Sequence, residues 1–240
     1  MTTLLPATLH ALHEMWAGRL GVHPSVFERE QTVYRDWPGA SAAVMVRAGW
    51  TVVIGAPEPA LTRLRELSRD HVQQPKSLMA ALSDLSPQLL GPACLAYADA
   101  DTLNLGAISQ VHRASRHELD MVLALCRGGD REESGLEEMT QWWVATDHDG
   151  EPVAAAGYET WDERVAHLGV LVAPRNRGTG RGAEVASAAI THALEAGLVP
   201  QWRSAVSNEQ SLQLGRHLGF VPHGEQVTLL LSGGGGPSAR

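Results

Sequence analysis

The chain has 240 residues and a net charge of −8, because 19 lysine and arginine residues face 27 aspartate and glutamate residues. This acidic balance disfavours a nucleic-acid-binding protein, since neutralising phosphates requires a basic face. With 44% hydrophobic and 19% charged residues, the composition is that of a globular protein with one or two domains. No apolar run has the length of a membrane span and no cleavable leader is evident, so we expect no membrane partner and a cytoplasmic location.

The cysteine and histidine residues show no metal-ligand spacing. Cys94 and Cys126 stand in apolar surroundings, which predicts reduced thiols in the core. The eleven histidines form no HxxxH or HExxH pattern, and no CxxC pattern is present. We therefore expect no metal site.

The first part of the chain mixes helices and strands and carries no recognisable active site. Leu5, Leu9, Leu12 and Trp16 follow one another at helical spacing, and Gly21 is a suitable end for that helix. The dipeptide Ala48-Gly49 is typical of a two-residue hairpin connection between strands at 43–47 and 50–54. Further strands are expected at 31–34 and 92–97, with helices from Pro59 and over 77–85.

We predict that residues 1–105 form a smaller α+β domain of unassigned role. One interpretation of this domain is a degenerate copy of the second half. The polar segment 99–106 is the best candidate for a boundary.

The second part begins with a clear helix signal. Ser115 and Glu118 form a capping box, with an apolar helical pattern behind it. The acidic segment 130–138 indicates a second helix, which either lines a cleft or is a solvated face. A hairpin over 142–160 turns at 147–150, and strands are expected at 165–172 and 226–231. We expect the glycine-rich tail, 233–240, to be disordered.

The strand at 165–172 leads into a turn rich in glycine and arginine, followed by a helix from Ala183 to about Ala196. The first amides of a helix have no partner inside it, and the helix dipole adds partial positive charge there. Gly178, Gly180 and Gly182 can adopt positive φ and let the backbone approach a ligand closely. The segment therefore predicts an anion site.

Three interpretations of these glycines compete with a connection that binds nothing. A nucleoside-triphosphate P-loop requires a GK[ST] ending, and no lysine is present in the turn. A dinucleotide fingerprint belongs near the start of a βαβ domain, whereas this turn comes late in the chain. The order Arg177-x-x-Gly180-x-Gly182, after a Val-x-Val strand, resembles the acetyl-CoA signature of the GNAT N-acyltransferase superfamily.

A second motif supports that resemblance. Asn208, Ser211 and the sequence Leu218-Gly219-Phe220 are similar to the later GNAT motif, in which a helix ends in Leu-Gly-Phe. The segment 201–206 stands where the family has its fifth strand. The resemblance covers residues 106–232 and implies an α/β protein with an α+β mixed sheet of GNAT type.

The resemblance further implies acetyl-CoA as cosubstrate, with its pyrophosphate on the turn and its pantetheine along the preceding strand edge. Asn208 would contact the pantetheine, cap the last helix, or do both. The residues predicted to bind the cofactor are Val170, Leu171, Val172, Arg177, Gly178, Thr179, Gly180, Arg181, Gly182, Asn208 and Ser211.

Transfer to an amine requires a base, a donor for the carbonyl oxygen and a proton for the thiolate. Glu159, His167 and Ser211 are the candidate catalytic side chains, and the backbone N–H of Val170 is the candidate oxygen donor. From the acidic segment, Glu132, Glu133 and Glu137 are further candidates for the base; solvated surface charge and packing are the alternatives. Many relatives carry a tyrosine after the leucine of the last motif, where this chain has Gly215.

The resulting hypothesis is an N-acetyltransferase that acts on a small-molecule or protein amine. A non-catalytic acyl-CoA-binding or sensor protein is the alternative, which Gly215 favours, and a nucleotide-binding module is a third. Pairing of exposed sheet edges into a homodimer is compatible with the sequence.

Overall fold

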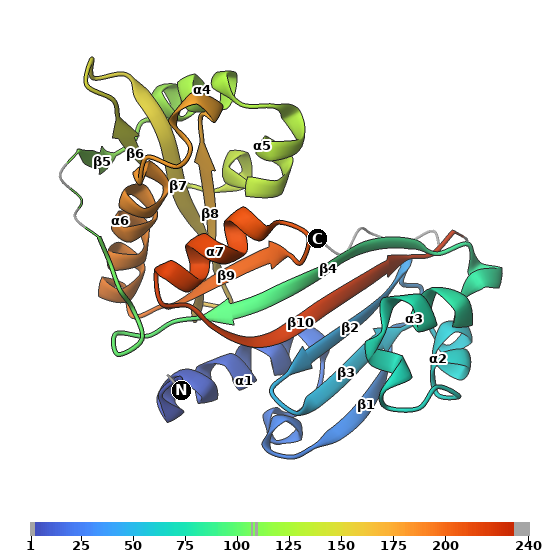
Figure 1. The fold of residues 1–240 in the computed structure, drawn as a ribbon. Helices are drawn as coiled ribbons and strands as arrows, with labels where there is room; N and C mark the ends of the chain where they lie inside the picture. Colours follow the sequence, from blue (N-terminus) through green and yellow to red (C-terminus); the bar gives the residue numbers. More distant parts are fainter. Residues whose placement is uncertain (1–2, 107, 109, 233–240) are drawn as a thin grey trace. The chain divides into compact units, whose positions relative to one another are not determined.

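Figure 1 shows the computed structural model of the chain, which describes residues 3–106, 108 and 110–232. The tail at 233–240 lies outside the described residues. The chain divides into two compact units, one with residues up to 12, 96–203 and 209–221, the other with 13–95, 204–208 and the rest from 222. We call them unit 1 and unit 2 and describe each by itself. The division runs through helix α1 and strand β4.

Unit 2 is built on strands in the order β1-β3-β2-β10-β4, with β1 parallel to β3 and β2 antiparallel to both of its neighbours. Helices α2 and α3 supply the apolar side chains that pack with β2, β3 and β10 in its core. The elements are α1 (Pro6–Leu20), β1 (Gln31–Asp36), β2 (Ala42–Ala48), β3 (Thr51–Ala56), α2 (Glu58–Leu64), α3 (Pro75–Ala81), β4 (Gln88–Tyr97) and β10 (Val221–Leu230), with 3₁₀ turns at Pro24–Glu28, His71–Gln73 and Ser83–Leu85.

Two features of unit 2 differ from the sequence prediction. The β2–β3 connection is Gly49-Trp50 instead of Ala48-Gly49, because Ala48 pairs with Thr51 and Gly49 takes a φ of +55° at the first turn position. Strand β10 pairs antiparallel with β2 from Gly224↔Ala48 to Leu230↔Ala42 and so joins unit 2, although it follows the GNAT-like motifs in the chain. The domain boundary near residue 105 stays a prediction.

Unit 1 has the strand order β4-β9-β8-β7-β6-β5, in which the contribution of β4 is its last two residues. Strands β5 to β8 are antiparallel, and β9 runs parallel to β8. The elements are β5 (Val111–Arg113), α4 (Arg116–Leu125), α5 (Gly128–Ser134), β6 (Gln141–Thr146), β7 (Pro152–Trp161), β8 (Val165–Val172), α6 (Arg181–Glu195), β9 (Val199–Ala205) and α7 (Glu209–His217), with 3₁₀ turns at Leu136–Glu138 and Pro174–Asn176.

Helices cover both faces of the unit 1 sheet (Figure 1). Side chains alternate along a strand, so β8 divides its residues between the two faces. Leu168 and Val170 pack with helix α6, whereas Leu171 packs with helix α4. We call these the α6 face and the α4 face. By the same alternation, His167 and Gly169 belong to the α4 face.

Most elements of unit 1 are predicted correctly. The capping box at Ser115 is confirmed, as are the hairpin of β6 with β7 and the strand over 165–172. Strand β5 is absent from the prediction because its three residues are too few to show a period. Cys94 and Cys126 are part-buried thiols, and burial raises the pKa of Cys126. Within the described residues, no helix has both the length and the hydropathy to cross a bilayer.

The start of α4 provides a test of stability against pH. Glu118 accepts hydrogen bonds from His112 Nε2 at 2.7 Å and from the backbone N–H of Ser115 at 2.8 Å, and these bonds hold its pKa at about 2 instead of 4.5. Because the folded-state pKa is lowered, the stabilisation is complete above pH 4.5 and disappears as the pH falls towards 2. Glu118→Gln should therefore lower the free energy of unfolding at pH 7, and its difference from the wild type should shrink through that range in urea titrations.

The cap itself can be tested with a matched pair. Ser115→Ala removes the acceptor for the Glu118 N–H and should cost about 1 kcal/mol. Ser207→Ala, in an exposed turn, should cost nearly nothing. Equal effects of the two serine variants would contradict the assigned cap.

Candidate functional site

The glycine turn has the backbone geometry that an anion site requires. Gly178 and Gly180 have φ values of +76° and +90°, and Gly180 is the N-cap of α6. A Cβ built on either glycine would meet no atom within 4 Å, so the space beside the turn is open. Gly182 has another role, because its Cβ would lie 3.2 Å from Val172 and 3.3 Å from Leu214, where α6 packs closely.

The amides of this turn are not used by the fold. The first backbone N–H groups that donate at the start of α6 are those of Ala183 and Glu184, both to the carbonyl of Gly180. Among the described residues, the N–H groups of 178–182 have no protein acceptor. Successive amides at a helix N-terminus, with the positive end of the helix dipole behind them, bind phosphate oxygens well.

Two arginines of the turn, Arg177 and Arg181, are ion-paired. Arg177 donates from Nη2 to Asp130 of α5 at 2.9 Å and from Nε to the carbonyl of Val172 at 3.2 Å. Arg181 pairs with Glu184 at 2.7 Å. These pairs partly neutralise the side-chain charge, so the backbone amides are the principal anion-binding groups that the turn offers. Thr179 serves the turn itself, since its hydroxyl donates to the carbonyl of Asn176 at 2.6 Å.

Strand β8 presents an edge next to the turn. Its parallel ladder with β9 ends at His167↔Gln201, although β8 continues to Val172. The two strands then take different directions in Figure 1. The N–H of Ala173 donates to the carbonyl of Val153 on β7. Counting back along β8 from Ala173, every second N–H group also points to β7. The amides of Val170 and Val172 therefore point to the side that β9 has left, as a pantetheine chain would require.

The structure brings Glu159 and His167 together. They are directly opposite each other in the β7–β8 ladder. Trp161 lies with them, because its indole N–H donates to Glu159 at 3.1 Å and its ring stacks on that of His167 with centroids 4.4 Å apart. The cluster lies beside the last rung of the β8–β9 ladder.

Two further residues of this cluster were not predicted. Gln201 bonds His167 Nδ1 at 2.9 Å, and its amide nitrogen donates to the hydroxyl of Tyr97 at 2.9 Å. A glutamine within the otherwise apolar start of β9 is the signal that could have drawn attention to it. Nothing local in the sequence marks Tyr97, which comes from β4.

Ser211 does not join this cluster. Its hydroxyl accepts from the indole N–H of Trp202 at 3.0 Å, and Trp202 packs with α6 and Phe220. Because Gln201 and Trp202 are neighbours in β9, they point to opposite faces of the sheet. Ser211 is therefore on the α6 face, whereas His167 is on the α4 face.

Trp202 also accounts for Gly215. A Cβ at this position of α7 would lie 2.9 Å from Cδ1 of Trp202 and 3.1 Å from its Cγ and Nε1. The indole thus fills the space into which a side chain at 215 would extend. A tyrosine cannot occupy this position while Trp202 keeps its place.

The remaining predicted residues lie on several elements. Asn208 immediately precedes α7, and its contact with a cofactor stays a prediction. The α5 region packs on β8 at Gly169, where a Cβ would collide with the carbonyl of Ser134, so it covers the α4 face. Glu132 and Glu133 are exposed on α5, whereas Glu137 pairs with Arg131 at 2.7 Å.

One group of side chains in the described residues has its donor atoms close enough for a metal ion. Asp147, His148 and Asp149 lie within 4.8 Å of one another in the β6–β7 turn. The Asp147 carboxylate accepts from the backbone N–H groups of Asp149 and Glu151, both at 3.0 Å, so it already serves the turn.

A family model matches the part of the chain that contains the glycine turn and strand β8. The model of the acetyltransferase (GNAT) family matches residues 113–220, from the end of β5 to the start of β10. Residues 113–220 are a GNAT acetyltransferase domain. Both motifs that predicted the family, the turn before α6 and the segment ending in Phe220, lie inside this GNAT domain.

One solved structure shares the fold over most of the chain, and two others are similar to it. A GCN5-related N-acetyltransferase-like protein from Streptococcus suis is 18% identical, with a TM-score of 0.50, 91% of this chain covered and 98% of its own. A GNAT-family acetyltransferase from Colwellia psychrerythraea is 19% identical (TM-score 0.47; 64% and 60% covered), and a tandem GNAT protein from the clavulanic acid biosynthesis pathway is 13% identical (TM-score 0.47; 94% and 95% covered). The chain thus spans less than two thirds of the Colwellia protein. Comparison with curated protein sequences found no match.

The anion site of the GNAT domain can be tested with two glycines of one helix. Gly180→Glu should abolish CoA binding in calorimetry, because it places a carboxylate among the open amides and strains a φ of +90°. Gly197→Glu is the matched control, since Gly197 follows the other end of α6, has a φ of +73° and is also in open space. If both variants fold and both retain CoA affinity, the turn is not the anion site.

The packing of α7 can be tested separately. Gly215→Ala should lower the free energy of unfolding by roughly 1–3 kcal/mol through overpacking against Trp202, although alanine favours a helix. Gly18→Ala, at an exposed position of α1 with nothing within 4 Å, should instead be neutral or stabilising. A stable Gly215→Ala protein in urea titrations would contradict the close packing.

Proposed function

We propose that the protein transfers an acetyl group from acetyl-CoA to an amine by direct transfer. The observation that carries this proposal is the open turn of amides at 178–182, next to a β8 edge whose partner strand has departed. The turn suits an anionic diphosphate, and the β8 edge suits an extended chain with amide groups. Each hydrogen bond contributes about 1 kcal/mol net, so several must act together.

An acyl thioester would supply an activated acyl carbon; the residues of the chain would hold it and move protons. The N–H of Val170 would donate to the carbonyl oxygen while the amine nitrogen bonds to carbon and the carbon–sulfur bond breaks. His167 would accept the proton that the amine loses. The sulfur would leave as a thiolate, which a thiol pKa of only about 8.5 allows although Gly215 carries no acid, and the proton held by His167 would pass to it through water.

The base is assigned to His167 ahead of the glutamates. His167 lies at the last rung before β8 and β9 separate, and its ring is held by Trp161 and Gln201. Glu159 is exposed and bonded to Trp161, and Glu137 is ion-paired. We regard Glu159 as the alternative base.

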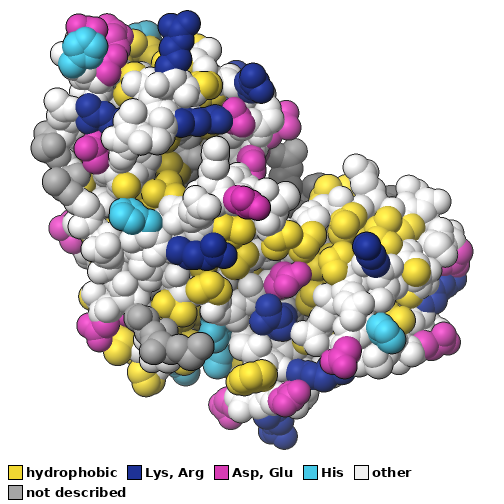
Figure 2. Space-filling view, viewed as in Figure 1, with side chains coloured by type: hydrophobic (Ala, Val, Ile, Leu, Met, Phe, Trp, Pro, Cys, Tyr) yellow, Lys and Arg dark blue, Asp and Glu magenta, His cyan; other side chains and the backbone are white. Residues whose placement is uncertain are grey.

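The acceptor is proposed to be an amine on a small molecule or a protein, and the net charge of −8 favours a cationic one. Acidic and basic side chains of the described residues are interspersed on the face shown in Figure 2. A cytoplasmic location, a homodimer and the absence of a metal remain predictions.

A non-catalytic acyl-CoA sensor is the second candidate function. The contact of Gly215 with Trp202 favours it, because the indole excludes the tyrosine that protonates the thiolate in many relatives. Both functions use the same anion site, so binding alone does not separate them.

Thiol release from acetyl-CoA with a panel of amines distinguishes the two functions. We expect release that depends on an amine, and we expect His167→Asn to lower kcat on the order of 100-fold or more without changing CoA affinity. His148→Asn, in the exposed β6–β7 turn, is the control and should keep full activity. Acetyl-CoA binding without turnover on any amine would support the sensor, and a loss confined to Glu159→Gln would move the base to Glu159.

A further inference from the structure

We propose that Gln201 is a positioning residue that fixes the tautomer of His167, with the hydroxyl of Tyr97 as the second partner of the Gln201 amide. This inference rests on the proposed function for its catalytic meaning. Its structural content, the proton on Nδ1 of His167, can be measured whether or not the protein transfers acyl groups.

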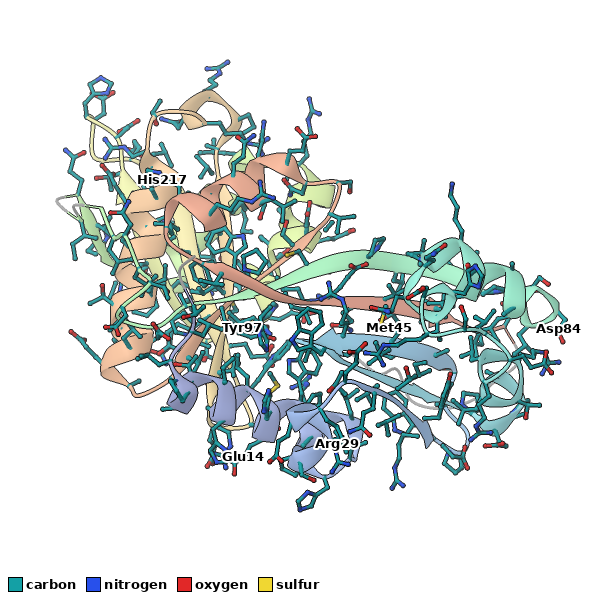
Figure 3. The ribbon with its side chains drawn as sticks, turned by 60° about the horizontal axis from the view of Figure 1, so that its bottom comes forward. Glu14, Arg29, Met45, Asp84, Tyr97 and His217 are labelled. Atoms are coloured by element: carbon teal, nitrogen blue, oxygen red, sulfur yellow. The ribbon has the colours of Figure 1, made fainter. Side chains whose placement is uncertain are left out.

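The hydrogen-bonded chain is buried at its inner end. Gln201 is 0% exposed, and Tyr97, which Figure 3 labels, is 1% exposed. The Gln201 Nε2 donates to the Tyr97 hydroxyl at 2.9 Å, and its Oε1 lies 2.9 Å from His167 Nδ1. A buried amide without partners costs about 1–3 kcal/mol, so these two contacts account for the tolerance of a glutamine here.

The orientation of the amide decides where the imidazole proton resides. With Nε2 directed to Tyr97, the Oε1 of Gln201 faces His167 and accepts only from an Nδ1–H group. The lone pair of the neutral ring is then on Nε2, which becomes its basic atom. The stacked ring of Trp161 fixes the plane of the imidazole.

The hydrogen-bonded residues His167, Gln201 and Tyr97 lie next to the proposed site of acyl transfer. His167 and Gln201 form the last pair of the β8–β9 ladder, and the Val170 amide begins the unpaired edge three residues further along β8. The pair His167↔Gln201 therefore both ends the β8–β9 ladder and contains the proposed base.

The Gln201 oxygen suits both states of the base. When His167 Nε2 takes the amine proton, both ring nitrogens carry hydrogen, and Nδ1 still donates to Oε1. A flipped amide would direct an NH₂ group at Nδ1 and oppose this charged state.

Charged residues near His167 influence the pH dependence of kcat/KM. On β7 the opposite residue is Glu159, and the β7–β8 turn contains Asp162, Glu163 and Arg164. Tyr97 is reached through Gln201. The expected shift is therefore measured relative to the wild type, in which all these groups are present.

The first experiment is long-range ¹H–¹⁵N NMR of the full chain with labelled histidine, at a pH where the ring is neutral. The His167 signals are assigned by their loss in His167→Asn. We expect Nδ1–H in the wild type and in Gln201→Glu, whose carboxylate still accepts from the ring, and a changed tautomer distribution in Gln201→Leu. A wild-type ring with its proton on Nε2 would overturn the proposal.

The second experiment separates positioning from a structural role. Gln201→Leu should lower kcat at least tenfold with KM for acetyl-CoA unchanged, whereas Gln226→Leu, a strand glutamine bonded to Thr228, should not. Gln201→Glu places a carboxylate beside the imidazole, so the acid limb of kcat/KM should move to higher pH by about one unit or more while the rate recovers at high pH. An unmoved acid limb in a folded Gln201→Glu protein would contradict the proposal.

The outcomes of the two experiments distinguish the two proposals. An Nδ1–H ring in a protein that acetylates no amine leaves the tautomer assignment intact and rejects the function. An active enzyme with an Nε2–H ring leaves the function intact and rejects the role of Gln201.

Discussion

The separation of β8 from β9 after the pair His167↔Gln201 is the constraint on which the site depends. A sheet normally uses both edges of an interior strand. Here the amides of Val170 and Val172 lose their neighbour while β8 continues to the glycine turn. The same departure brings the buried Gln201 amide to the point where the unpaired edge begins.

In the proposed anion site, the groups available to an anion are the backbone amides more than the side chains of Arg177 and Arg181. Arg177 is shared between Asp130 and the Val172 carbonyl, so it joins α5 to the end of β8. Arg181 pairs with Glu184 within the first turn of α6. The amides of 178–182 have no such partners in the described residues, and two glycines of this turn have positive φ. The acidic net charge of the chain is therefore compatible with a local anion site.

Trp202 determines the packing around Gly215. Its indole bonds Ser211, packs with Phe220 and fills the space beside Gly215. This arrangement lets α7 approach β9 closely, but it leaves no room for an acid at that position. The proposed base, His167, lies instead on the other face of the sheet, stacked on Trp161.

The sequence by itself determined the strand at 165–172, the glycine turn, the capping box at Ser115 and the GNAT family, because each is written in contiguous residues whose local chemistry is nearly sufficient. The strands predicted over 142–160 and 165–172 carry Glu159 and His167, and the structure shows these two residues directly opposite each other. Only the tertiary structure placed Gln201 between His167 and Tyr97, Asp130 on Arg177, and β10 on β2. These contacts join segments that are distant in the chain. The packing of the whole sheet decides such pairings, and neither partner shows a periodic or compositional pattern from which they could be predicted.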